Sequence, residues 1–282
     1  MSPLIRTMTL TDIPAGMRLK DLAGWNQTEQ DWHRFLEDSP SGCFVAAQDQ
    51  RVVGTVTTIT YENRLAWIGM VLVDPEFRGR GIGTTLLRQA IDHLDARGIP
   101  CLKLDATPQG RPIYERLGFR REYEIERCFL EKEAGARPSP IASREAQELN
   151  SVWEMDREVF GADRSTLLQS IAKDASEYAI VAREAGALTG YAFGRKGSRA
   201  DHLGPWVASN ASAAREILDI FLRTSRREIV FVDVVKDNAW GPELACQAGF
   251  RFSRTLTRMH RGENPKPGRV DLLGAILGPE FG

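Results

Sequence analysis

A chain of 282 residues that is 42% hydrophobic is long enough for two modest domains, since a domain usually holds roughly 100–200 residues. The net charge is −1, with 37 Lys and Arg against 38 Asp and Glu, which excludes an overall attraction to nucleic acid or to an anionic membrane. We expect neither as a partner.

Neither the cysteines nor the histidines are spaced as metal ligands or as a disulfide framework. The first residues lack an apolar signal core, and no stretch approaches the roughly 18 apolar residues that span a membrane. The sequence therefore predicts a cytoplasmic protein without a bound metal.

The first half predicts a series of strands interrupted by one long helix. Three short β-rich runs between Cys43 and Val73, separated by polar turns, indicate neighbouring antiparallel strands. From Ile82 to Arg97 apolar residues recur at helical spacing, which predicts a helix that ends near Gly98. The predicted unit is completed by a strand over 100–106, a short helix closed by Gly118 and a last strand over 119–130.

The second half repeats this order weakly. Gly54 follows Val45 at the same interval at which Gly190 follows Val181, and each pair lies in a β-rich run, which predicts the same hairpin twice. The sequence thus favours an α/β (α+β) fold with two units in tandem. Each unit is expected to contain a mixed, mostly antiparallel sheet flanked by helices.

Between the two units, residues 131–147 are rich in Pro, Ala, Ser and charge and have no apolar face. This composition is typical of a linker. With a boundary near Ala136, we expect a first domain over 1–135 and a second over 138–282.

A glycine-rich turn joins the strand that ends at Val73 to the long helix that begins at Ile82. Its glycines keep side chains away, so that backbone N–H groups can face an anion, and the helix start adds free N–H groups and a positive dipole end. Neither a Walker loop nor a Rossmann fingerprint matches. The turn therefore predicts a diphosphate site formed by Arg78, Gly79, Arg80, Gly81, Ile82, Gly83 and Thr84.

The pattern Arg-x-x-Gly-x-Gly after Val-Leu-Val-Asp-Pro, followed further along by Tyr-Glu-Arg-Leu-Gly-Phe, resembles the GCN5-related N-acetyltransferase (GNAT) family. The resemblance covers about residues 4–130 and implies that acetyl-CoA (coenzyme A carrying the acyl group) binds at the turn. It also implies that the backbone of Val71, Leu72 and Val73 orients the pantetheine arm and that Tyr114 protonates the departing thiolate. A half-buried packing role is the alternative for Tyr114.

The resemblance leaves the general base unassigned, because the strand Leu65–Val73 carries no carboxylate or histidine. Glu62 in the preceding turn is the nearest acid, with a solvated surface role as its alternative, and Asp105 ends the next strand. We expect the amine to lose its proton through ordered water, with one of these acids, or to bind partly neutral. The family's first helices cover the acceptor, which implies substrate-side roles for Trp25, Asn26 and Gln27, with core packing as the alternative for Trp25.

The second unit lacks both signatures. The turn after its third strand contains no glycine, and Ala245 precedes Gly249 at the spacing at which Tyr114 precedes Gly118. In this respect the chain is similar to a two-unit bacterial subgroup of the YitH type. We expect a degenerate, cofactor-free unit that helps to shape the acceptor pocket. Six arginines make this half locally basic and form either a solvated face or a cluster that lines the pocket for an anionic acceptor: Arg226, Arg227, Arg251, Arg254, Arg258 and Arg261.

The sequence predicts an N-acetyltransferase that moves an acetyl group from acetyl-CoA to a primary amine of a small molecule. Direct attack in a ternary complex is expected, because no cysteine is placed near Tyr114 and the glycine turn. An acyl-CoA sensor or scaffold without turnover and a protein-lysine or longer-chain acyltransferase remain alternatives. Monomer and homodimer both stay open.

Overall fold

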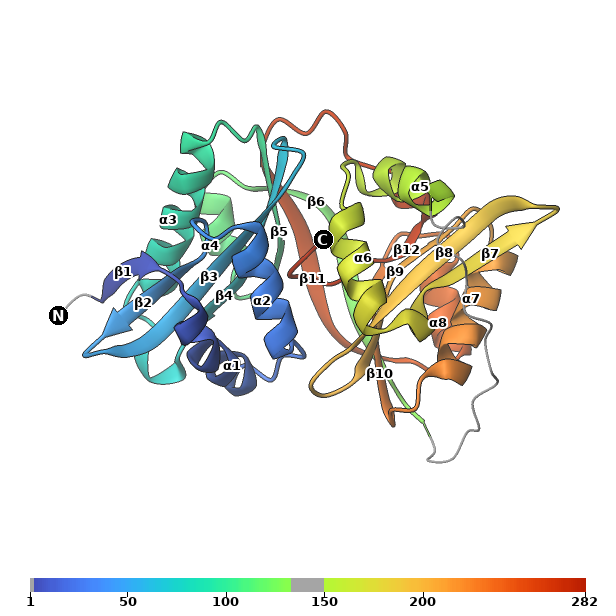
Figure 1. The fold of residues 1–282 in the computed structure, drawn as a ribbon, viewed down its shortest axis with the longest axis horizontal. Helices are drawn as coiled ribbons and strands as arrows, with labels where there is room; N and C mark the ends of the chain where they lie inside the picture. Colours follow the sequence, from blue (N-terminus) through green and yellow to red (C-terminus); the bar gives the residue numbers. More distant parts are fainter. Residues whose placement is uncertain (1–2, 133–149) are drawn as a thin grey trace.

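A computed structural model describes residues 3–132 and 150–282 (Figure 1). The predicted boundary near Ala136 and most of the predicted linker lie outside these residues. None of the helices in the described part of the chain is both long enough and apolar enough to cross a bilayer.

In the first half, the strands and helices predicted between Cys43 and Leu130 are confirmed. The elements are β1 (Leu4–Thr7), α1 (Ile13–Leu22), α2 (Glu29–Asp38), β2 (Phe44–Gln48), β3 (Arg51–Tyr61), β4 (Leu65–Val73), α3 (Ile82–Ala96), β5 (Cys101–Ala106), α4 (Arg111–Arg116) and β6 (Arg120–Glu131). Short 3-10 turns lie at Leu10–Asp12 and Pro75–Phe77.

The second half repeats this order, as the sequence predicts. Its elements are α5 (Asn150–Phe160), α6 (Ser165–Asp174), β7 (Ile180–Glu184), β8 (Ala187–Lys196), β9 (Asp201–Ala208), α7 (Ala211–Thr224), β10 (Ile229–Val235), α8 (Gly241–Gln247), β11 (Arg251–Gly262) and β12 (Leu273–Ala275). Further 3-10 turns lie at Ser176–Tyr178 and Val270–Leu272. Ala46 pairs with Gly54 and Ala182 with Gly190, and each pair is followed by a bulge, so the predicted hairpin occurs twice.

Helices cover both faces of the first half's strands. On one face α3 buries Ile82, Leu86 and Leu94 against apolar residues of β2 to β5. On the other face α2 buries Trp32 and Phe35. Because both faces are covered, β3 and β4 are buried along almost their whole length, which explains why they consist of long β-branched and apolar runs.

The strands of both halves form one 12-stranded sheet in the order β1-β2-β3-β4-β5-β11-β6-β10-β12-β9-β8-β7. The pairs β4–β5 and β9–β10 are parallel, and the other pairs are antiparallel. The expected mixed, mostly antiparallel α/β fold is therefore confirmed.

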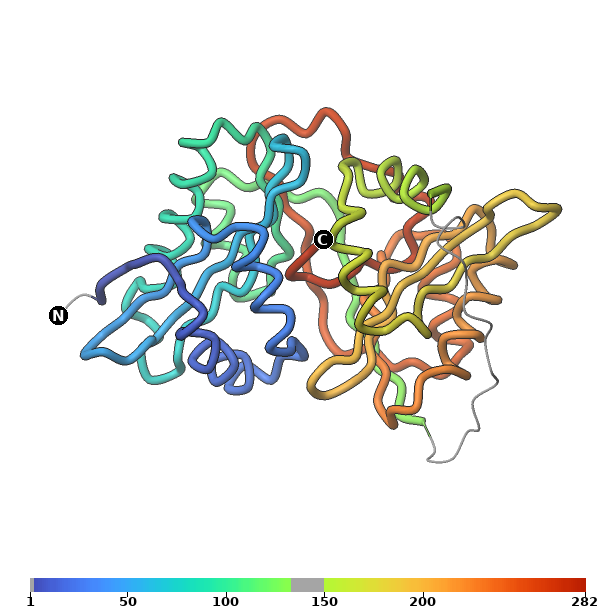
Figure 2. The backbone as a smooth tube through the Cα atoms, in the orientation of Figure 1, coloured from blue at the N-terminus to red at the C-terminus, as the bar shows by residue number. Residues whose placement is uncertain are grey.

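The two halves exchange their last strands. β6 pairs with β10 and β11, whereas β11 pairs with β5, so the strand predicted over 119–130 does not complete the sheet of the first half. This part of the prediction is wrong. Both β5 and β10 need an antiparallel neighbour, and the alternation of side chains in β6 is compatible with pairing to either of these two strands. Figure 2 shows the chain end marked C in the middle of the molecule, between the two halves.

The parallel strands of each half diverge. β4 and β5 pair only from Leu65 to Trp67, and beyond them β4 bulges at Met70, which has a φ of +50°. The first half thus has a split between β4 and β5, at the end where the glycine turn begins. In the second half the corresponding split is filled by β12, which pairs with β9 and β10.

Candidate active site

A cavity of about 80 Å³ lies at the split between β4 and β5. Among the residues predicted for the site, those that line it are Trp25, Gln27, Val71, Asp105 and Tyr114. The exchanged strands and the segment after β12 contribute further lining residues, Arg127, Arg254, Leu256, Pro279 and Glu280. Residues from both halves therefore form this cavity.

Tyr114 reaches the cavity from α4, the short helix that precedes β6. Its ring packs edge-on against Phe119, with 6.2 Å between the centroids, and closely against Gly110, where a Cβ would lie 3.0 Å from the ring. Burial raises the pKa of the Tyr114 phenol to about 12. The phenol is thus a protonated group at neutral pH that faces the split.

The glycine turn is open at the start of α3. Gly79 and Gly81 have φ values of +76° and +79°, and a Cβ added to either would meet nothing within 4 Å. The first helical hydrogen bond of α3 is donated by the N–H of Thr85 to the carbonyl of Gly81, at 3.0 Å. The N–H groups before Thr85 therefore have no carbonyl partner within the helix and can face an anion.

The buried carboxylate of Asp74 fixes the position of the glycine turn. Asp74 accepts hydrogen bonds from Arg18 at 2.6 Å and from Arg51 at 2.7 Å, and its own N–H donates to Val53 in β3. Arg78 then folds back, and its Nε donates to the carbonyl of Val73 at 3.1 Å. These bonds fix where β4 ends and where the turn begins.

Asp105 lies at the cavity with both carboxylate oxygens already bonded. Arg258 of β11 donates to them from Nε at 2.9 Å and from Nη2 at 2.8 Å, and the Asp105 side chain has no exposed surface. The same guanidinium donates to Tyr123 at 2.6 Å and lies 4.5 Å from the Trp67 ring centroid. Asp105 therefore anchors a strand of the other half.

Glu62 is not brought to the cavity. It lies in the β3–β4 turn, where Arg64 and Arg157 donate to its carboxylate at 2.8 and 2.5 Å. Burial would raise its pKa, but hydrogen bonds from the Asp163 backbone and from Arg64 outweigh burial and lower it. The bulge at Met70 lies five residues beyond Leu65, the start of β4, which is a distance of roughly 17 Å along the strand at 3.3 Å per residue. Glu62 lies before the start of β4, whereas Tyr114 lies at the cavity near the bulge, so the two side chains are at different ends of this strand.

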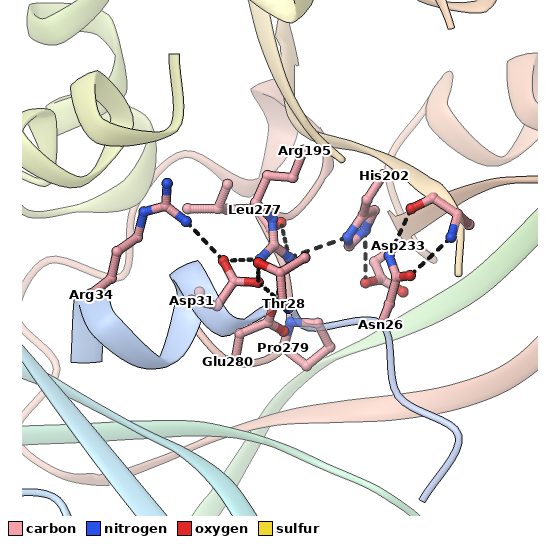
Figure 3. A network of polar contacts seen from close by, with 12 residues as sticks. Asn26, Thr28, Asp31, Arg34, Arg195, His202, Asp233, Leu277, Pro279 and Glu280 are labelled. Atoms are coloured by element: carbon pink, nitrogen blue, oxygen red, sulfur yellow. Dashed lines mark hydrogen bonds and ion pairs between the residues drawn. The ribbon is translucent and has the colours of Figure 1, made fainter. Parts of the chain in front are cut away.

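The predicted acceptor residues separate into two groups. Trp25 and Gln27 line the cavity, whereas Asn26 points to the second half. The Asn26 side-chain oxygen accepts from the N–H groups of Arg199 and Ala200 at 2.9 and 3.0 Å, and its amide donates to the Ala200 carbonyl (Figure 3). Asn26 thus holds the β8–β9 turn.

The corresponding positions of the second half are closed. The Asn210 side chain accepts from the N–H of Ala213 at 2.9 Å and so caps the start of α7, which is the counterpart of α3. Ala245, the counterpart of Tyr114, is buried in a hydrophobic core. The second half therefore has a filled split, a capped helix start and an alanine, where the first half has an open split, an open glycine turn and Tyr114.

Glu280 is a cavity residue that sequence reasoning missed. Its side chain is 3% exposed, and its Oε2 has no hydrogen-bond partner among the residues that the structure describes. The available signal was a single carboxylate within the apolar run from Leu272 to Gly282, because a charge in such a run is either buried with a partner or functional. No motif connects this residue to β4.

Within residues 3–132 and 150–282, no group of three or more His, Cys, Asp or Glu side chains is arranged to hold a metal ion. The cysteines Cys43, Cys101 and Cys128 are buried, and burial raises the pKa of each thiol, to about 12, about 11 and about 11. The cavity lining includes no cysteine among the described residues.

Comparison with known proteins identifies the family. A model of the acetyltransferase (GNAT) family matches residues 12–119, and a model of the acetyltransferase (GNAT) domain matches residues 152–274. The chain belongs to the GNAT superfamily of acyltransferases and carries two GNAT domains, one in each half.

Named relatives agree with this assignment. The chain is 24% identical over 260 residues to a holothin acyltransferase of Pseudoalteromonas sp., covering 92% of this chain and 87% of that protein. It is 28% identical over 158 residues to the uncharacterized N-acetyltransferase YitH of Bacillus subtilis, 55% of each chain, which confirms the expected likeness to the YitH type. A mycothiol acetyltransferase of Thermomonospora curvata is 35% identical over 85 residues, 29% of each chain.

Solved structures share the fold over the whole chain. A putative acetyltransferase from Pyrococcus horikoshii has a TM-score of 0.82 at 24% identity, covering 100% of this chain and 96% of that one. A GCN5-related N-acetyltransferase from Sphaerobacter thermophilus has a TM-score of 0.68 at 18% identity, with 95% and 98% covered.

Proposed function

We propose that this protein transfers an acetyl group from acetyl-CoA to a primary amine of a small molecule, using the site in its first half. The observation that carries the proposal is that the split between β4 and β5 holds a cavity lined by Tyr114, while β4 leads on directly to the open glycine turn at the start of α3. When bound, acetyl-CoA supplies the activated acetyl group.

The residues of this site fit coenzyme A. Around Gly79 and Gly81 the space that a Cβ would fill is empty, so a diphosphate can approach the N–H groups of residues 78–84. Beyond Trp67 the edge of β4 that faces β5 has no strand pairing, so we assign the backbone of Val71–Val73 to the pantetheine arm, with the Val73 carbonyl also accepting from Arg78.

Tyr114 acts as the general acid. It keeps its proton at neutral pH, because burial raises its pKa to about 12, and it donates that proton to the departing sulfur. Direct attack by the amine is supported by the absence of a cysteine from the described cavity lining.

The second half contributes lining residues to the acceptor side of the cavity and does not form a second cofactor site. β12 occupies its split, and Asn210 caps α7 where the diphosphate would bind. Its residues on β11 and after β12 complete the acceptor side of the cavity instead.

Release of free CoA from acetyl-CoA, measured with a panel of primary amines, tests the function. We expect release that depends on both substrates, with double-reciprocal plots that intersect. Parallel plots would indicate a covalent enzyme intermediate, and tight binding of acetyl-CoA without release with any amine would favour a sensor. The names of two relatives, holothin acyltransferase and mycothiol acetyltransferase, support turnover over sensing.

A further inference from the structure

Three buried polar atoms without hydrogen-bond partners belong to residues that line the same cavity. They are Oε1 of Gln27, Nε of Arg254 and Oε2 of Glu280, and none has a partner among the described residues. Gln27 is 5% exposed and Glu280 is 3% exposed. Because an unpaired buried polar group destabilises the protein, a ligand that supplies the missing hydrogen-bond partners binds more tightly.

Glu280 is positioned by contacts from both halves. Arg195 donates to its Oε1 at 2.5 Å and is itself held by Asp31 at 3.3 Å, with His202 on its other side (Figure 3). The neighbouring backbone is fixed because Trp67 Nε1 donates to the carbonyl of Pro279 at 2.9 Å. One oxygen of the Glu280 carboxylate is thus engaged, and the other is left for a ligand.

The backbone beside Glu280 lies directly against β4. A Cβ on Gly69 would stand 3.0 Å from the Glu280 carbonyl oxygen, so only a glycine at this point lets the segment approach so closely. Gly69 also lines the cavity and precedes the bulge at Met70. Glu280 therefore stands next to the strand to which the proposed function assigns the pantetheine arm.

Arg254 stands out among the charged lining residues. Arg127 donates to Asp233 at 2.7 and 2.6 Å, and Asp105 is paired with Arg258, whereas Arg254 has no carboxylate partner in the described part of the chain. Burial and the nearby Arg127 lower the pKa of Arg254 to about 10, which still leaves it protonated at neutral pH. It is an unpaired cation at the wall of the cavity.

We propose that the acceptor is a small zwitterion, a molecule that carries an acidic group together with its primary amine, as an amino acid does. This inference rests on the proposed function and specifies its acceptor. Glu280 Oε2 and Gln27 Oε1 accept hydrogen bonds from the ammonium group, and Arg254 donates to the acidic group. Glu280 then takes one proton from the ammonium: an N–H bond breaks, an O–H bond forms, and the nitrogen keeps the electron pair with which it attacks.

The test uses matched acceptors: an amino acid, its primary amide, and the amine that lacks the acidic group. We expect wild-type kcat/KM to be highest for the amino acid. Arg254→Met should lower it at least about tenfold for the amino acid alone, through KM, so that the three acceptors become similar. Arg254→Lys should retain part of the preference.

Arg251→Met is the matched control, since Arg251 lies on the same strand but is exposed and paired with Glu131 at 2.5 Å. It should leave the preference unchanged. If Arg254→Met loses stability, the ratio between acceptors still reports on the pocket, because unfolding lowers all three rates equally.

Glu280→Gln should lower kcat roughly 100-fold for every amine while the Kd for CoA stays the same. A wild type that prefers the amide or the plain amine, an Arg254→Met enzyme that keeps the preference for the acid, or a fully active Glu280→Gln enzyme overturns the inference. These results are distinct from failure of the proposed function, in which no amine at all releases CoA.

Discussion

Arg258 and Asp105 form a two-point ion pair that joins the exchanged strand β11 to β5, with side chains only 4% and 0% exposed. Removing one partner of a buried pair leaves an uncompensated charge. We therefore expect Arg258→Met to lower the free energy of unfolding by about 3–5 kcal/mol, measured by urea denaturation.

The control for this variant lies three residues further along β11. Arg261 pairs with Asp95 at 2.7 Å, but the two side chains are 32% and 42% exposed, so Arg261→Met should cost less than about 1 kcal/mol. Equal losses in the two variants would contradict a structural role for the buried pair.

The glycine turn and the far end of the same helix offer a second matched pair. Gly81 and Gly98 both have positive φ, +79° and +69°, and both face empty space. An alanine at either position is strained by roughly 1–2 kcal/mol, so the two variants should lose similar amounts of Tm. Only Gly81→Ala should weaken CoA binding, at least about tenfold by calorimetry, because only its Cβ would stand at the diphosphate. Unchanged affinity in Gly81→Ala would exclude the turn as the cofactor site.

Tyr114→Phe should lower kcat roughly 100-fold and leave the Kd for CoA unchanged, since the ring packing against Phe119 remains. The raised pKa also predicts a pH dependence. A general acid must be protonated to act. With a pKa of about 12, Tyr114 keeps its proton from pH 7 to pH 10, so its contribution to kcat should stay constant over this range. A loss of kcat near pH 9 that disappears in Tyr114→Phe would show that this phenol ionises earlier.

Substitutions of the neighbouring residues Asn26 and Gln27 should affect different properties, stability in the first case and KM for the amine in the second. Asn26→Ala removes three hydrogen bonds to the β8–β9 turn and should lower the free energy of unfolding by about 2 kcal/mol or more. Gln27→Leu removes an oxygen that has no partner in the described structure, so stability should hold while KM for the amine rises. Thermal denaturation and initial rates distinguish the two effects, and a stable Asn26→Ala protein with a raised KM would reverse the assignment.

One CoA molecule should bind per chain. β12 fills the split of the second half, and the Asn210 side chain occupies the helix start that would receive the diphosphate. Calorimetric titration measures the stoichiometry directly, and a second equivalent of bound CoA would show that β12 can leave its place.

The sequence predicts the features that depend on local pattern. The helix at Ile82 and the turn before it follow from spacing and glycine chemistry, and Tyr114 follows from its motif. Glu280 escapes such reasoning, and nothing in the sequence separates Arg254 from the other arginines of the second half, because both roles arise from contacts with residues far away in the chain. Arg254 reaches the cavity only because β11 crosses into the first half, and a period of two residues does not reveal which edge a strand joins.

The shared strands also limit how the molecule can move. Parting the sheet between β11 and β6 would break the long ladder that joins these two strands, and parting the halves of the sequence would break the β5–β11 and β6–β10 ladders, so either opening costs many backbone hydrogen bonds. Acceptor and product must therefore pass through rearrangements of side chains and short connections around the cavity, and heating should melt both halves in a single cooperative transition.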